Sequence, residues 1–312
     1  MRIVFAGSPD IALPSLIKVA LNFDVVAVLT NPDKVSGRGR KVKFNPVKTK
    51  ALELNLNVIQ ADSLNGELRK KIELLNPDIL VVFAYGKIFG PKFLGIFPSG
   101  GVNIHPSLLP LYRGSSPIMS AILNGDSETG ISVQRINLKM DTGAILNQQK
   151  IVLTGEESTE SLSSFISVEA SELLIRTLKE IEAGEPIERE QDEKFVSYCT
   201  KIVKEDGRIN WNESAMQIDR KIRAYTPWPR AFTRFKDKNL MLLKGGIYTR
   251  ENDLSGEPGT VLGFDKSDGI LIQTGDGILS IKFLQLESKK AIDWKSFING
   301  TQDFIPCVLG GE

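Results

Sequence analysis

Histidine, cysteine and long apolar runs are all scarce in this chain, and each scarcity excludes a class of protein. Its 312 residues include one histidine and two cysteines, which are too few for the Cys and His sets that bind structural zinc. Because Cys199 and Cys307 stand far apart, without metal or redox spacing, we expect both to be reduced thiols in the cytoplasm. No apolar run approaches the length needed to cross a bilayer.

Glycine-rich phosphate-binding motifs and targeting segments are missing as well. Residues 1–30 contain neither G-x-G-x-x-G nor G-x-x-x-x-G-K-[ST], which argues against nicotinamide dinucleotides and P-loop nucleotides as ligands. No basic segment or cleavage site accompanies the first apolar run, so we expect no secretory signal. With 41% apolar and 25% charged residues, the composition is that of a globular protein, and 312 residues are enough for one large or two ordinary domains.

The net charge of +1 conceals a segregation of charge along the chain. Residues 31–50 hold seven basic side chains and one acid, residues 151–200 hold twelve acids and four bases, and residues 201–250 hold twelve bases and five acids. Two basic regions on either side of an acidic one would suit a polyanion bound at two points. Solvated surfaces can have the same composition, so charge alone leaves both interpretations open.

Apolar periodicity predicts a parallel sheet in the first half of the chain. Residues 2–6, 24–29 and 78–84 read as buried strands, and segments with helical spacing of apolar residues separate them. This alternation predicts a Rossmann-like α/β domain with a parallel sheet. A long helix over residues 158–182, ended by Gly184, would pack on that sheet.

The second half of the chain has a different pattern. Residues 185–206 are polar and acidic and lack a strong period, as in an interdomain linker. Five short strands then follow at close spacing, over residues 231–235, 240–248, 260–264, 269–273 and 278–286. We therefore expect a catalytic α/β domain over residues 1–189, a linker over 190–206, and a basic C-terminal OB-fold β-barrel over 207–312. Such a barrel would bind a nucleic-acid backbone without reading bases.

The sole histidine lies in the most informative stretch, N-x-H-P-S-L-L-P-x-Y-R-G-x-x-P-I, over residues 103–118. Period-2 alternation places Asn103 and His105 on the same side of a strand end, and three prolines restrict the loop that follows. An imidazole beside an amide suggests proton transfer next to a hydrogen-bond donor. A single histidine at a strand end is also a common structural residue, so the pattern alone does not establish catalysis.

This stretch resembles the signature of the folate-dependent formyltransferases, most closely that of the members acting on methionyl-tRNA. The resemblance implies a metal-free, monomeric, cytoplasmic enzyme that moves a formyl group from 10-formyltetrahydrofolate to the free α-amine of initiator methionyl-tRNA. It implies that Asn103 and His105 are catalytic and donate to an oxyanion. The residues that would border the folate are Ser107, Leu108, Leu109 and Pro110.

A second element that resembles the family lies at residues 140–143, Met-Asp-Thr-Gly. Asp-Thr-Gly between two strand-like runs forms a turn by itself, and most aspartates in such turns only cap the backbone. In the formyltransferases this element supplies the catalytic carboxylate, which the resemblance assigns to Asp141. Asp141 would orient His105 and favour its imidazolium form. The family usually has glycine where this chain has Lys139, a departure that bears on the geometry of the turn.

The resemblance assigns roles to two further segments. Tyr85 and Gly86 follow the strand 78–84 at the sheet edge where ligands bind. By itself this is an ordinary turn, but it resembles the family element A-Y-G-x-I, which implies contact with the pterin, largely through the backbone. The basic loop within residues 31–50 is by composition equally an RNA contact or a disordered surface loop. It resembles a family insertion that enters the tRNA acceptor arm, which assigns tRNA binding to Arg38, Lys41 and Lys43.

Three other functions share parts of this pattern. A formyltransferase for glycinamide ribonucleotide or an amino-sugar nucleotide would use the same chemistry without needing the basic insertion or the C-terminal barrel. A hydrolase domain that transfers the formyl group to water would leave the basic regions unexplained. A non-catalytic RNA-binding protein on a degenerate scaffold is disfavoured by the presence of Asn103, His105 and Asp141 together.

Overall fold

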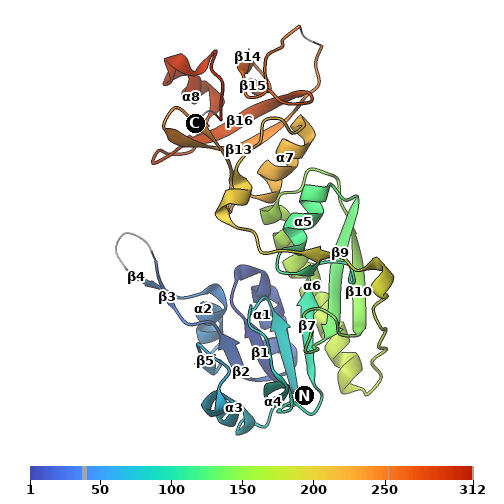
Figure 1. Ribbon diagram of the computed structural model, residues 1–312. Helices are drawn as coiled ribbons and strands as arrows, with labels where there is room; N and C mark the ends of the chain where they lie inside the picture. The colour runs from blue at the N-terminus through green and yellow to red at the C-terminus, as the bar shows by residue number, and fades with distance from the viewer. Residues whose placement is uncertain (37–40, 252, 311–312) are drawn as a thin grey trace. The chain divides into compact units, whose positions relative to one another are not determined.

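The computed structural model describes residues 1–36, 41–251 and 253–310 and divides into two compact units (Figure 1). The first unit consists of Met1–Pro117, Glu128–Val152 and Ser163–Cys199, and the second of Ile118–Ser127, Leu153–Leu162 and Thr200–Glu312. Two short segments that interrupt the first unit in sequence, residues 118–127 and 153–162, therefore belong to the second unit. The predicted functional boundaries after residues 189 and 206 stay predictions.

A seven-stranded sheet forms the centre of the first unit, in the order β10-β9-β7-β6-β1-β2-β5. Its strands are β1 (Arg2–Gly7), β2 (Asp24–Thr30), β5 (Val58–Gln60), β6 (Ile79–Phe83), β7 (Gly101–His105), β9 (Glu128–Arg135) and β10 (Ile145–Val152). The strands from β5 to β7 in this order are parallel, whereas β9 and β10 are antiparallel. Parallel pairing brings the carboxyl ends of β1, β6 and β7 to one edge, where open α/β sheets bind ligands.

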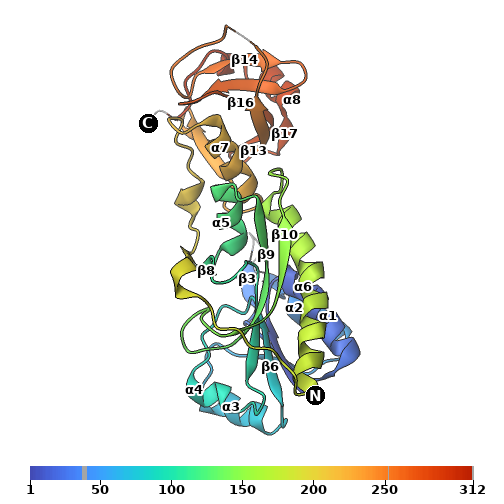
Figure 2. The same cartoon turned by 90° about the vertical axis from the view of Figure 1, so that its right-hand side faces the viewer.

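Helices cover both faces of this sheet (Figure 2). They are η1 (Asp10–Ala12), α1 (Leu13–Asn22), α2 (Pro46–Glu53), α3 (Gly66–Glu73), α4 (Pro91–Leu94) and α6 (Thr159–Glu182). An ion pair between Lys18 and Glu172 joins α1 to α6 on one face. On the other face α3 and α4 bury Leu68, Ile72 and Phe93 against the sheet. Burial of these apolar faces is what holds the layers together.

Two small two-stranded sheets complete the first unit. The antiparallel pair β3 (Lys34–Ser36) and β4 (Lys41–Lys43) lies on either side of residues 37–40, which are outside the described part of the chain. The parallel pair β8 (Arg113–Gly114) and β11 (Tyr198–Cys199) places the segment after η2 (Glu193–Phe195) alongside the loop that follows β7. Part of the predicted linker therefore packs within the first unit.

An antiparallel sheet forms the centre of the second unit, in the order β12-β13-β16-β15-β14, with β17 beside β16. Its strands are β12 (Ala231–Phe235), β13 (Lys238–Tyr248), β14 (Val261–Asp265), β15 (Gly269–Gln273), β16 (Ile278–Leu286) and β17 (Ile292–Asp293). The helical elements are α5 (Pro117–Asn124), η3 (Lys204–Gly207), α7 (Ala215–Ala224), α8 (Trp294–Asn299) and η4 (Gln302–Phe304). Helix α7 begins at a capping box between Ser214 and Gln217 and buries Ile218 and Ile222 in the core.

The predicted fold class is confirmed in its main features: a parallel-dominated sheet with helices precedes an antiparallel β unit. Strands expected over residues 231–235, 269–273 and 278–286 coincide with β12, β15 and β16. Short apolar runs bounded by turn residues set these limits, because burial and turn chemistry agree there.

Candidate active site

His105 ends strand β7 and is almost completely buried, with 4% of its surface exposed. Its Nε2 atom lies 2.8 Å from the carbonyl oxygen of Tyr112. A carbonyl can only accept, so Nε2 carries a hydrogen and, in the neutral ring, Nδ1 keeps its lone pair. Tyr112 has a left-handed φ of 58°, a strained conformation for a non-glycine residue. The loop after β7 thus folds back and selects which nitrogen of His105 is the base.

Asp141 faces that second nitrogen from the loop between β9 and β10. Its Oδ2 atom lies 3.7 Å from Nδ1 of His105 and accepts a hydrogen bond from the backbone N–H of Gly114 at 2.9 Å. Its Oδ1 atom accepts from Nε2 of Gln134 at 3.0 Å and from Nδ2 of Asn103 at 3.4 Å. The structure therefore brings Asp141 into one cluster with Asn103 and His105, from which it is distant in sequence.

The turn that carries Asp141 is tight. Asp141 has a left-handed φ of 55°, and a Cβ atom placed on Gly143 would lie 1.8 Å from the carbonyl oxygen of Arg135. Only glycine fits at position 143, which explains the Asp-Thr-Gly order. The hydroxyl of Thr142 donates to the carbonyl of Lys139 at 3.0 Å. The turn therefore forms with Lys139 at the position of the usual glycine, and it places the Asp141 carboxylate beside His105.

Burial lowers the pKa of His105 below its ordinary value of 6.5. The charge of Asp141 and the hydrogen bond to the Tyr112 carbonyl raise that pKa, but they do not offset the loss of hydration. The expectation that Asp141 favours the imidazolium agrees with the direction in which its charge shifts the pKa, but burial has the larger effect. The resting ring is neutral at pH 7, with Asp141 placed to stabilise the cation when it forms.

This depressed pKa predicts a loss of stability on acidification. Below about pH 6.5 the unfolded chain protonates His105 while the folded chain does not, so the free energy of unfolding falls as the pH falls through that window. In the His105→Gln variant this contribution is absent. We expect its melting temperature to drop less than that of the wild type between pH 7.5 and pH 5.5. An identical drop in both proteins, measured by thermal denaturation, would contradict the assignment.

The four residues predicted to border the folate divide into two kinds. Ser107 and Leu109 are buried: the Ser107 hydroxyl donates to the Leu111 carbonyl at 2.6 Å, and the Leu109 N–H donates to the Ser132 hydroxyl at 3.1 Å. Leu108 and Pro110 are half-buried. Hydrogen bonds of the buried pair shape the loop, and the other two side chains lie closer to its surface.

Tyr85 and Gly86 follow β6 at the sheet edge. The Tyr85 ring is buried in the core, stacked on Phe89 with 5.6 Å between ring centroids, and burial raises the pKa of its hydroxyl to about 12. Its carbonyl accepts from Nδ2 of Asn31 at 2.9 Å. Gly86 is exposed and has a φ of 77°. Because the Tyr85 ring packs inward, this segment presents backbone groups to a flat ligand.

The predicted tRNA-binding residues lie at the edge of the described chain. Arg38 is outside the described residues. Lys41 and Lys43 are in β4, where their backbone pairs with Ser36 and Lys34 of β3. Polar contacts join the segments that precede and follow β3 and β4. Lys48 pairs with Asp33 at 2.5 Å, and Gln60 donates to the Asn31 carbonyl at 2.8 Å.

Sequence reasoning missed residues that hold the cluster. Gln134 of β9 lies opposite Asn103 of β7 in the sheet register and binds Asp141. Gln191 donates to the Asp141 carbonyl at 2.9 Å. Gln134 had a signal, because it and Ser132 alternate with the apolar residues Ile131 and Val133. No comparable signal marks Gln191, because its neighbours in the sequence are also polar.

Two family models match the chain: Formyl transferase over residues 1–178 and Formyl transferase, C-terminal domain, over residues 201–302. The chain belongs to the formyl transferase family. The predicted family and the prediction that the chain is an enzyme are therefore confirmed. A curated relative from Treponema denticola, named methionyl-tRNA formyltransferase, is 43% identical over 316 residues, covering 98% of each chain.

Solved structures support the fold of this formyl transferase. A methionyl-tRNA formyltransferase from Clostridium thermocellum has a TM-score of 0.54 and 18% identity, covering 80% of this chain and 94% of that one. HypX from Aquifex aeolicus, in complex with tetrahydrofolic acid, has a TM-score of 0.65 and 18% identity over 97% of this chain. The chain spans about half the length of HypX, 48% of that protein.

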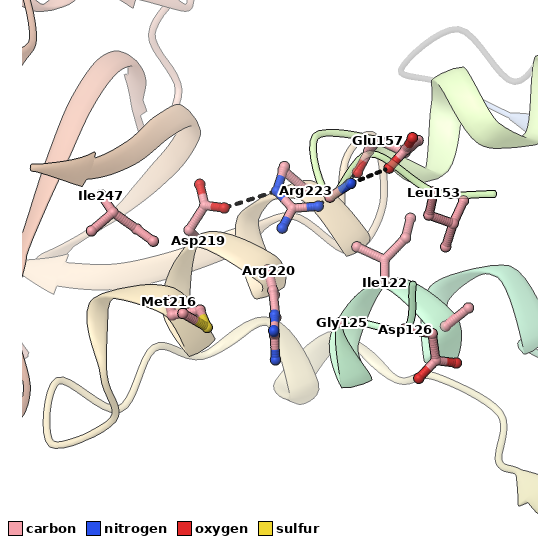
Figure 3. A pocket seen from close by; sticks show the side chains of 12 residues that line it. Ile122, Gly125, Asp126, Leu153, Glu157, Met216, Asp219, Arg220, Arg223 and Ile247 are labelled. Carbon is pink, nitrogen blue, oxygen red and sulfur yellow. Dashed lines mark hydrogen bonds and ion pairs between the residues drawn. The ribbon is translucent and has the colours of Figure 1, made fainter. Parts of the chain in front are cut away.

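A separate hollow of about 230 Å³ lies in the second unit of this formyl transferase (Figure 3). Its charged groups bind one another or the backbone: Arg223 donates to Asp219 at 2.8 Å and to the Glu157 carbonyl at 2.9 Å. Arg220 donates to the Asn124 carbonyl at 3.2 Å and lies against Gly125, where a Cβ atom would be 2.0 Å from its Cζ. Burial raises the pKa of the Glu157 carboxyl, but hydrogen bonds from the backbone and side chain of Thr154 lower it, and the net shift is below the ordinary value. None of the predicted site residues that the structure describes lines this hollow.

In the described part of the chain, no helix has the length and apolarity to span a membrane. Within the same residues, no group of three or more His, Cys, Asp or Glu side chains is arranged to hold a metal ion.

Proposed function

We propose that the chain transfers the formyl group of 10-formyltetrahydrofolate to the α-amine of initiator methionyl-tRNA, giving N-formylmethionyl-tRNA. The observation that carries the proposal is the cluster in which Nδ1 of buried, neutral His105 faces Asp141 at 3.7 Å beside the Asn103 amide. The names of relatives that are 39–43% identical over nearly the whole chain support the choice of acceptor. We further propose that the enzyme is a cytoplasmic monomer.

His105 is the base in this scheme. Model α-amines titrate at about 7.7–8.0, so a useful fraction of the acceptor is already neutral at pH 7.5 and can attack the formyl carbon. As the new N–C bond forms, the attacking nitrogen becomes acidic, and Nδ1 of His105 takes its proton. The imidazolium that results lies between the Asp141 carboxylate and the Tyr112 carbonyl, both of which favour the charged ring.

Asn103 stabilises the negative charge on the former formyl oxygen. A side-chain amide has two N–H donors, and Asp141 takes one of them at 3.4 Å. The other can donate to the oxyanion of the tetrahedral intermediate, a contact typically worth about 2.7–4 kcal/mol. The same bond to Asp141 orients the amide before the substrate arrives, so no reorganisation is needed during the reaction.

Collapse of the intermediate returns the proton to the departing folate. The bond between the formyl carbon and N10 breaks, and the imidazolium of His105 donates to N10, so His105 ends neutral and the folate leaves as tetrahydrofolate. Backbone groups of Tyr85 and Gly86 would border the pterin, and the loop from Ser107 through Leu108 and Leu109 to Pro110 would border the rest of the folate. The scheme requires no metal.

The acceptor would be held by basic residues in two separate parts of the chain. We propose Arg38, with Lys41 and Lys43, as the contact with the acceptor stem, and the basic C-terminal unit, within residues 207–312, as a contact with the phosphate backbone. Residues 1–189 would form the catalytic domain and residues 190–206 the connection between them. Charge-driven contacts of this kind weaken steeply with added salt.

Replacement of Arg38 by alanine should separate the two substrates. We expect the KM for methionyl-tRNA to rise about tenfold, the loss of roughly one charged contact, while the KM for 10-formyltetrahydrofolate stays within twofold. Steady-state kinetics at two salt concentrations, with Lys18→Ala on α1 as a charge-matched control, measure both values. Equal changes in the two KM values would refute the role of Arg38 in tRNA binding.

The proposed reaction is tested by an acceptor competition. Purified protein and 10-formyltetrahydrofolate are offered methionyl-tRNA, a glycinamide ribonucleotide, an amino-sugar nucleotide, or water alone, and formylated product is quantified for each. Formylation of methionyl-tRNA at a rate at least 100-fold above the others is the expected result. Preferential formylation of a nucleotide, or release of formate without an acceptor, would replace the proposal with the corresponding alternative.

A further inference from the structure

The segment of residues 191–199, here called the strap, lies against both loops that form the active site. It pairs with the loop after β7 through β11 and β8. The Arg113 N–H donates to the Ser197 carbonyl at 2.9 Å, and the Ser197 N–H donates to the Pro110 carbonyl at 3.3 Å. All these residues belong to the first unit. The strap is thus built into the catalytic unit.

On one side the strap holds Tyr112. The Ser197 hydroxyl accepts a hydrogen bond from the Tyr112 N–H at 2.8 Å. Tyr112 is the left-handed residue, with a φ of 58°, whose carbonyl fixes Nε2 of His105. A conformation of this kind persists only where surrounding contacts over-determine it. Ser197 supplies such a contact directly at the strained residue.

On the other side the strap holds Asp141. The Gln191 side chain is 8% exposed, and its Nε2 donates to the carbonyls of Asp141 at 2.9 Å and Gly143 at 2.8 Å. Asp141 is also left-handed, with a φ of 55°. Gln191 therefore clamps both ends of the turn that presents the carboxylate to His105.

The orientation of the Gln191 amide is itself determined by charge. Oε1 of Gln191 accepts from Nε of Arg113 at 3.0 Å, and a guanidinium can only donate. Arg113 is buried, with 2% of its surface exposed, and pairs with Glu193 of the strap at 2.7 Å. The oxygen of the amide is therefore directed to Arg113 and its nitrogen to the Asp141 turn.

We propose that Gln191 and Ser197 are positioning residues for formyl transfer, which act by holding Asp141 and Tyr112 at the two nitrogens of His105. The inference rests on the proposed function, because it assigns these residues a part in that reaction. The strap would therefore affect the rate of formyl transfer, although no strap residue takes part in the chemistry.

The test uses Gln191→Leu, which removes the donors at similar volume, and Ser197→Ala, which removes the acceptor. Full-length variants are assayed with methionyl-tRNA and 10-formyltetrahydrofolate. We expect kcat to fall at least about tenfold, since small misplacement of catalytic groups costs up to roughly 100-fold. Both KM values should stay within about twofold, because the strap does not bind substrate.

The pH profile separates positioning from a general loss of structure. Within the described residues, the ionisable side chain that faces His105 is Asp141, and the other polar group against the ring is the Tyr112 carbonyl. Both raise the pKa of His105, so loosening either should move the acidic limb of kcat/KM to lower pH. Partial unfolding would lower the rate at every pH without moving the limb.

Two control variants and a double variant complete the design. Gln149→Leu, on β10 with its amide directed to Glu169, should retain wild-type kinetics, and Ser197→Thr, which keeps the hydroxyl, should restore kcat to within about threefold. In an Asp141→Asn background, Gln191→Leu should cost less than about twofold, because the group it positions is already lost.

Three outcomes would overturn the inference: a wild-type kcat in both strap variants, a loss expressed mainly in KM, or full additivity of Gln191→Leu with Asp141→Asn. Each presupposes a wild-type enzyme that formylates methionyl-tRNA. If the wild type fails to do so, the proposed function itself fails, and the two failures are therefore distinguishable.

Discussion

The His105→Ala variant is expected to turn over at least about 100-fold more slowly than the wild type, because a positioned general base contributes roughly 100- to 10,000-fold. Among the described residues, His105 is the only imidazole, and its Nδ1 faces Asp141, which also binds the Asn103 amide. Water can enter the vacated space, but it is a much weaker base than imidazole. The loss should appear in kcat, measured under single-turnover conditions with methionyl-tRNA.

Loss of volume is separated from loss of the base by a second variant. His105→Gln fills most of the space and can still donate to the Tyr112 carbonyl, but it has no lone-pair nitrogen for proton transfer. It should be as slow as His105→Ala while its melting temperature at pH 7.5 stays within a few degrees of the wild type. Near-normal turnover by a folded His105→Gln protein would remove His105 from the mechanism.

The Asp141→Ala variant is expected to lose activity by a similar factor, at least about 100-fold, since removing the partner of a catalytic histidine can cost as much as roughly 10,000-fold. The carboxylate stabilises the imidazolium, orients the Asn103 amide and accepts the Gly114 N–H at once. The charge of Asp141 raises the pKa of His105, so its removal should also shift the acidic limb of the pH profile to lower pH.

Asp141→Asn provides the isosteric comparison. It retains one acceptor oxygen, so it can keep the Gly114 bond that supports the turn, but it supplies no charge to the imidazolium. If charge is the main contribution, Asp141→Asn should be nearly as slow as Asp141→Ala, and kcat should carry the loss. Recovery of more than about half of the wild-type rate in Asp141→Asn would show that orientation alone is needed.

The fold could be predicted from local patterns because burial and turn chemistry agree along most of the chain. The apolar runs at residues 2–6 and 78–84 became β1 and β6. The compact units were less predictable, since the segments 118–127 and 153–162 belong to the second unit. Their assignment depends on packing between distant segments, which no local period encodes.

The site could be predicted only in part, because its assembly also depends on packing between distant segments. Asn103 and His105 share a strand, so their proximity follows from period 2. That Asp141 reaches them depends on β9 pairing with β7 and on the turn closed at Gly143. For Tyr85 the resemblance implied backbone contact with the pterin, and only the structure shows that its ring packs on Phe89 in the core.

By itself the sequence determined the family, the order of strands and helices, and the residue types available for proton transfer, because these depend on local pattern and on side-chain chemistry. Only the tertiary structure decided that His105 is neutral at rest, that Nδ1 is its basic atom, and that Gln191 supports Asp141. Each of these depends on burial and on hydrogen bonds between segments far apart in the chain. Dehydration and partner geometry set a pKa and a tautomer, and both arise only when the chain has folded.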